Sequence, residues 1–165
     1  TRMNVKFTYH HSEPDTEWLY RHWDGYPSVA GVEILRALCK CWTDFANEHG
    51  YQPNDIRYCH GTADLEHVLR GVCAELEHKR IEGAMNDYCV PADGQSPDIE
   101  WLYTLEADTY LDEPVIIFEA VLKRTKKELK AMPRNEEHKF AEGHVFSKWA
   151  EIRDARWWFE GKYKS

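Results

Sequence analysis

The sequence predicts an α+β fold, with a largely antiparallel sheet of four to five strands packed against three helices in one domain spanning residues 1–165. At 165 residues, the chain is long enough for a single domain with a proper core. Segments in which apolar and polar residues alternate stand on both sides of segments with helical spacing, and no internal repeat or linker divides them.

The N-terminal part predicts a hairpin followed by a helix. Residues 3–9 alternate between apolar and polar side chains, which indicates a half-buried strand. Residues 17–23, beyond the loop "HHSEPDT", are interpreted as its hairpin partner. Apolar residues then recur at helical spacing over 29–48, and Gly50 stands where a helix would end.

The stretch "RHWDGYPSVAG" (residues 21–31) joins that strand to that helix. Asp24-Gly25 is a turn dipeptide, Pro27 forces an extended residue before it, and Ser28 is expected to cap the helix. Trp23 and Tyr26 are then expected to fill the corner between strand and helix. The alternative is an anion-binding pocket at the helix N-terminus, with a ligand-binding set of Arg21, His22, Asp24 and Tyr26.

The middle of the chain predicts a second helix and a second hairpin. The helix is expected to begin at Thr62, which can cap it, and to end at Gly83. Residues 86–91 and 99–106 are interpreted as two hairpin strands, because Asp93-Gly94 between them has turn chemistry.

The last strand and the C-terminal segment complete the predicted elements. Residues 115–122 are apolar on both faces, which favours a central strand or one covered on its second face by another helix or subunit. Beyond it, a Trp-rich segment over about 134–160 has a helical pattern.

Charge is distributed unevenly along the chain. The net charge is -8, and residues 81–122 contain ten acids and no Lys or Arg. Such a field repels phosphates and attracts basic surfaces, so we expect no direct contact with nucleic acid. The acidic run is either a solvated sheet face or a partner-binding surface for a basic protein groove, and the second reading selects Asp93, Asp98, Glu106, Asp108, Asp112 and Glu113.

No complete catalytic or cofactor motif is present, so we predict neither a cofactor nor a metal site. His60, Asp64 and His67 have ligand-like spacing, but a helix starting at Thr62 would leave His60 off their face. Small residues near His67 on the same face, such as Gly71, predict close approach of another element. Five cysteines without regular spacing favour reduced thiols. No apolar run could span a bilayer and the first residues lack a signal-peptide pattern, so a cytoplasmic location is expected.

Two segments, "LYRHWDGYPSVAG" (19–31) and "DIEWLYTLE" (98–106), resemble the paired signatures of small, largely uncharacterised bacterial and phage proteins with an HWDGYP-type motif. In that family a strand ending in the motif leads into a helix, and a Gly-Asp-Ile-Glu-Tyr-Leu-Tyr-like strand returns. This chain has Ser96-Pro97 where the Gly is expected, and Trp101 replaces the Tyr. The resemblance covers about the first 107 residues and implies an origin, with no activity attached.

Together these observations predict a non-enzymatic, macromolecule-binding protein of phage or mobile-element type. An inhibitor of a host defence system, comparable to an anti-CRISPR protein, fits an acidic surface of this kind. The alternative is an enzyme or a binder of small anionic ligands at the junction 21–28. A homodimer that covers the sheet face through Val115, Ile117 and the C-terminal aromatics is a third interpretation.

Overall fold

The structure, a computed structural model, describes residues 2–51, 61–82, 89–110 and 112–122. Their elements in chain order are β1 (Met3–Thr8), β2 (Thr16–Arg21), the π-helical turn η1 (Pro27–Gly31), α1 (Val32–His49), α2 (Thr62–Glu82), β3 (Val90–Ala92), β4 (Trp101–Tyr110) and β5 (Glu113–Leu122). The predicted α+β class is confirmed, with two α-helices in the described part of the chain. The third predicted helix, at about 134–160, lies outside the described residues.

The five strands form one mixed sheet in the order β3-β2-β1-β4-β5. The predicted hairpin of β1 and β2 is confirmed, with Met3 opposite Arg21 and Thr8 opposite Thr16. β1 also pairs with β4, in parallel, so that Met3 lies opposite Trp101 on its other side. The other two pairings, β2 with β3 and β4 with β5, are antiparallel.

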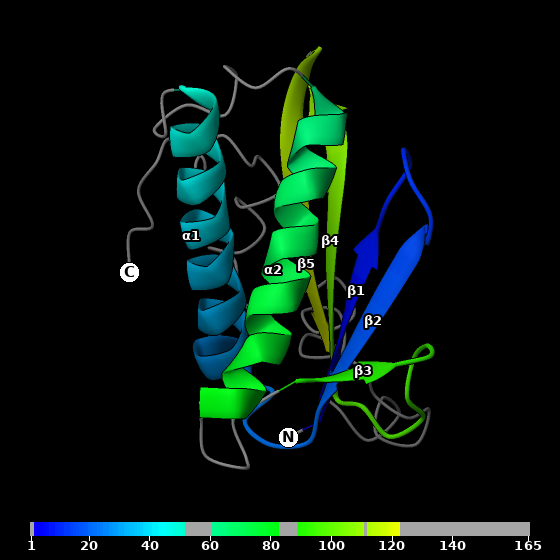
Figure 1. The fold of residues 1–165 in the computed structure, drawn as a ribbon. Helices are drawn as coiled ribbons and strands as arrows, with labels where there is room; N and C mark the ends of the chain where they lie inside the picture. The colour runs from blue at the N-terminus through cyan, green and yellow to red at the C-terminus, as the bar shows by residue number, and fades with distance from the viewer. Residues whose placement is uncertain (1, 52–60, 83–88, 111, 123–165) are drawn as a thin grey trace.

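The two helices form one layer over one face of this sheet (Figure 1). They run antiparallel, because Lys40 of α1 meets Glu75 of α2 and Phe45 meets His67. Alternate strand residues face the helices and are fully buried, which gives β1 and β4 their central place in the core. The buried apolar residues of the strands are Met3, Val5, Phe7, Leu19, Trp101, Tyr103, Leu105, Ala107, Ile116 and Phe118.

The ends of the first helical segment follow from backbone geometry. Gly50 ends α1 in the left-handed conformation (φ 71°), and its amide donates to the carbonyls of Ala46 and Asn47, as expected for a glycine helix stop. At the start, Tyr26 O accepts the amides of Val29 and Ala30 within a π-helical turn. The N-cap position of α1 is therefore Gly31, and the prediction that Ser28 caps this helix is wrong.

The predicted hairpin between residues 86–91 and 99–106 is wrong. β3 pairs with the outer side of β2, with Val90 opposite Tyr20, and β4 crosses beneath to the far side of β1. Asp93-Gly94 forms a bend after β3, but β4 pairs with β1 over six positions and shares its buried face. β4 instead forms its hairpin with β5, whose Glu113 lies opposite Tyr110.

The position of β5 also differs from the expectation of a central strand. Within the described residues β5 pairs with β4 alone and lies at the edge of the sheet. Its residues Ile116 and Phe118 are buried beneath the helices, whereas Ile117 on the other face is half-buried. The apolar character of both faces therefore does not place this strand in the sheet interior.

On the face opposite the helices, the loop 93–99 folds over the start of β1. Asn4 is fully buried there, although its alternation with apolar residues marks a solvent-facing position. Its side-chain oxygen accepts the amide of Ser96 at 2.7 Å, and its nitrogen donates to Leu19 O at 2.9 Å. One amide side chain thus fastens this loop to the two strands of the hairpin.

Two glycines give a matched test of the helical layer. A Cβ on Gly71 would lie 3.5 Å from the Cys41 sulfur, an ordinary contact, so Gly71→Ala should raise the free energy of unfolding by about 0.5–1 kcal/mol. Gly50→Ala should lower it by about 1 kcal/mol, because Gly50 has φ 71°. Urea unfolding followed by circular dichroism measures both; a stabilising Gly50→Ala would contradict the helix stop.

Candidate functional site

The junction between β2 and α1 is built around a buried arginine. The Arg21 side chain is 1% exposed and forms an ion pair with Glu33 in the first turn of α1. Its Nε also donates to the carbonyl of Trp23 at 2.7 Å. A buried guanidinium needs such partners to offset the loss of hydration. Arg21 therefore fastens the strand, the loop and the helix to one another.

A second buried contact holds the turn itself. The Tyr103 hydroxyl, on central strand β4, donates to Gly25 O at 2.6 Å. Burial raises the pKa of Tyr103, so the hydroxyl keeps the proton that it donates. Asp24 has a positive φ of 54°, which aspartate and asparagine adopt more readily than most residues. The turn is thus held from the core by a protonated phenol and by local backbone geometry.

With Arg21 and Tyr103 in the interior, the aromatic side chains of the junction face solvent. Trp23 is 51% exposed, Tyr26 49% and Val29 37%, and they are the exposed large hydrophobic residues of the described part of the chain. The His22 ring lies edge-on to Trp23 at 5.0 Å and bonds the Tyr20 hydroxyl through Nδ1 at 2.8 Å. The prediction that Trp23 and Tyr26 fill the corner is wrong, because Arg21 and Tyr103 occupy it.

The four residues of the alternative anion pocket have different surroundings. Arg21 is inside the protein and bound to Glu33, whereas His22, Asp24 and Tyr26 are exposed. An anion that bound Arg21 would have to compete with the Glu33 carboxylate. The structure therefore gives Arg21 a scaffolding contact and leaves the other three at the surface.

The candidate acidic residues divide between two ends of the sheet. Asp98 is 76% exposed beside Arg2 (3.7 Å), at the end where β2 leads into the junction, and Glu100 is exposed next to it. Asp93 is exposed after β3. Trp101 and Asp108 are seven positions apart along β4, so the other end is about 23 Å away at 3.3 Å per residue.

The other four candidates belong to that far end, and two of them make local contacts. Glu106 meets His10 at 2.5 Å, and the Asp108 carboxylate accepts the amide of Thr109 at 2.7 Å. Asp112 is exposed in the β4–β5 turn with φ 63°. Glu113 begins β5, but its side chain is outside the described part of the structure. The acidic run is therefore one field in the sequence but two groups in space.

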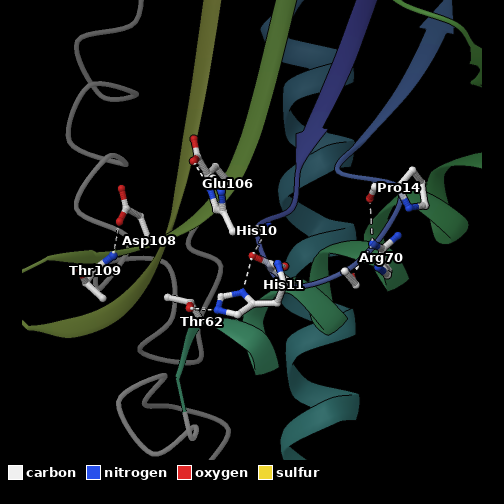
Figure 2. Close-up of polar contacts among 10 residues, drawn as sticks. His10, His11, Pro14, Thr62, Arg70, Glu106, Asp108 and Thr109 are labelled. Carbon is white, nitrogen blue, oxygen red and sulfur yellow. Dashed lines mark hydrogen bonds and ion pairs between the residues drawn. The ribbon is translucent and has the colours of Figure 1, made fainter.

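A polar cluster absent from the sequence predictions joins the β1–β2 loop to α2 (Figure 2). Glu66 is 2% exposed, and its carboxylate accepts the amides of His10 (2.8 Å) and His11 (3.0 Å) together with His11 Nδ1 (3.0 Å). Burial opposes ionisation of Glu66, but these hydrogen bonds outweigh it and hold its pKa below the usual value. A buried glutamate therefore holds the hairpin loop onto the helix.

Arg70, one turn further along α2, holds the other side of the same loop. Its guanidinium lies 3.9 Å from the centre of the Tyr9 ring and donates to Ser12 Oγ and Pro14 O. It also lies 3.3 Å from Glu17, which accepts the Tyr9 hydroxyl at 2.6 Å. Burial and the contact with Glu17 raise the pKa of Tyr9. For Glu66, one sequence signal could have indicated its role: it is an acid at a position of α2 that the neighbouring Leu65 and Leu69 mark as buried.

The chemistry of the remaining groups is restricted. Among the described residues, no group of three or more His, Cys, Asp or Glu is arranged to hold a metal ion. The described cysteines are free thiols, and burial raises the pKa of both Cys41 and Cys73.

None of the described helices has the length and apolar character needed to cross a membrane.

Comparison with protein families, with curated proteins and with solved structures finds no match for this chain. The resemblance to proteins with an HWDGYP-type motif stays a prediction.

The Glu66 contacts lead to a stability prediction. Glu66→Gln should lower the free energy of unfolding by about 1–3 kcal/mol, because the two loop amides lose a charged, buried acceptor. The difference from wild type should fade as pH falls below about 4.3, the unfolded pKa of a glutamate, since the folded pKa is lowered. Urea unfolding at several pH values measures this. The exposed control Glu100→Gln should stay within about 0.5 kcal/mol of wild type.

His10 gives the opposite pH dependence. The hydrogen bond to Glu106 raises the pKa of His10, so the contribution of this pair is present below about pH 6.5 and lost as pH rises through the folded pKa. His10→Gln should therefore cost up to about 1 kcal/mol at pH 5.5 and almost nothing at pH 9, because the pair is exposed. Glu106→Gln should reproduce this pattern in the same unfolding assay; a larger loss at pH 9 would contradict the pairing.

Proposed function

We propose that this protein binds a basic protein surface through the end of its sheet that carries the junction. The junction surface is defined here as exposed Trp23, Tyr26 and Val29 with the acids Asp24, Asp98 and Glu100 at the same end of the sheet. The observation that carries the proposal is the outward position of Trp23 and Tyr26, which core contacts hold in place.

Rigid exposed aromatics are the residues that dominate protein interfaces. Tryptophan and tyrosine are enriched among hot spots, and their burial on binding supplies most of the affinity. An aromatic held on a fixed loop loses little entropy when it binds. Arg21 and Tyr103 provide that fixation from the core.

The acids determine which partner this surface suits. Asp24, Asp98 and Glu100 are exposed, and Arg2, beside Asp98, is itself only partly exposed. With a net charge of -8, the protein attracts cationic surfaces over a distance of about one Debye length. The cationic groove of a nucleic-acid-binding protein has this character. We propose as partner a nucleic-acid-binding complex of a host defence system, with this chain as an inhibitor of phage or mobile-element type.

The test compares variants of the full chain as baits in a bacterial lysate and then with the purified partner. Trp23→Ala/Tyr26→Ala should weaken partner binding by about 30-fold or more, as expected when hot-spot aromatics are lost. Asp98→Asn/Glu100→Gln should reduce both affinity and its salt dependence. Double-stranded oligonucleotide should compete with the wild-type chain for the same partner.

The matched control removes the same charge from the far end of the sheet. Asp108→Asn/Asp112→Asn should bind like wild type, because these residues lie about 23 Å from the junction end by strand length. Asparagine also tolerates the positive φ of Asp112. Equal loss in both charge variants, or full binding by the aromatic variant, would overturn the proposal.

A further inference from the structure

A groove of about 200 Å³ separates part of α1 from α2. Its floor is apolar because the buried residues Phe45 and Val68 line it and Gly71 contributes no side chain. Cys41 lies across from Gly71, with its sulfur 3.5 Å from the place where a Cβ would be. The His67 ring stands 5.6 Å from Phe45 and forms part of the wall. The hollow is therefore a consequence of a glycine at the helix contact.

One rim of this groove is anionic. Asp44 and Glu48 are exposed and lie one turn apart on α1, so both carboxylates stand along the same side. Neither forms an ion pair with another described residue. Lys40, one turn before Asp44, donates to Glu75 of α2 at 2.8 Å instead. No lysine or arginine is among the residues that line the groove. Among the described residues, then, no ion pair engages these two carboxylates, which leaves them to a cation from outside.

We propose that this groove binds a lysine side chain of another protein. The alkyl stem would lie on Phe45 and Val68, and the ammonium would lie between Asp44 and Glu48. Lysine combines an apolar stem with a compact charged head, which matches an apolar floor beside an anionic rim. The volume is below the roughly 300–1,000 Å³ of sites for drug-sized ligands, so a single side chain is the fitting occupant. The site is separate from the junction surface and does not depend on it.

Two small probes test the proposal on the full, isotope-labelled chain by NMR titration. The first is Nα-acetyl-lysine N-methylamide, and the second is the norleucine analogue, which has the same alkyl stem without the ammonium. The lysine probe should shift the amides of the groove residues in a saturable way. The norleucine probe should bind about fivefold more weakly, the factor expected for an exposed charge contact.

Variants separate the charge from the shape. Asp44→Asn/Glu48→Gln should weaken the lysine probe about fivefold and leave the norleucine probe unchanged. Gly71→Leu should abolish binding of both probes by filling the groove, whereas Ala74→Leu, at an exposed position of α2 outside the groove, should bind like wild type.

Three results would overturn the proposal: equal affinity for the two probes, unchanged lysine binding by Asp44→Asn/Glu48→Gln, or shifts confined to other parts of the chain. Circular dichroism reports whether each variant folds. If Gly71→Leu does not fold, the double carboxylate variant decides alone, because it changes exposed side chains only.

Discussion

Parallel pairing of β1 with β4 is the constraint on which the rest of this structure depends. A parallel neighbour cannot be reached by a tight turn, so the chain between them has to leave the sheet and return. α1 and α2 lie in that crossing, and both lie over one face (Figure 1). The side chains of β1 and β4 that face them form the centre of the core. The hairpin partners β2 and β5 then extend the sheet on either side.

The same arrangement separates the two ends of the sheet by role. One end is fastened to α2 through Glu66 and Arg70, which form hydrogen bonds with polar groups of the β1–β2 loop. The other end carries the junction, where Arg21 and Tyr103 take the interior and leave Trp23 and Tyr26 outside. Polar groups that satisfy one another stabilise the fold, and those left in solvent are available to partners. The functional proposal therefore rests on the second end.

Local sequence signals predicted the strands and helices themselves better than they predicted which strands pair with each other. The alternation in residues 3–9, the stripe in α1 and the stop at Gly50 each depend on nearby residues, and each is confirmed. The partner of β4 depends on which strand offers the larger buried face, and no turn dipeptide encodes that choice. Asp93-Gly94 therefore suggested a hairpin that β1 prevents by pairing with β4.

In the candidate site, too, local features were predictable from the sequence and long-range contacts were not. The sequence correctly singled out the residues of 21–31 as unusual, but it could not tell which of them face inward. A buried arginine is the less common outcome for that residue type, and it depends on Glu33, twelve positions away. Likewise, charge in a continuous run of sequence does not imply a continuous surface, because a ten-residue strand carries its two ends far apart. Glu66 was missed because a buried acid inside an apolar stripe needs amides from another segment, which the sequence of α2 does not contain.

The surroundings of Cys41, across the groove from Gly71, determine the chemistry of its thiol. Burial, with the nearby Glu75 carboxylate, raises the pKa of the Cys41 thiol to about 11. At neutral pH only about one such thiol in ten thousand is ionised, and only the ionised form attacks electrophiles or disulfides at a useful rate. Cys73, beside Glu17, is held in its protonated form as well. Reagents that attack thiolates should therefore react more slowly with these two thiols in the folded chain than in the unfolded chain.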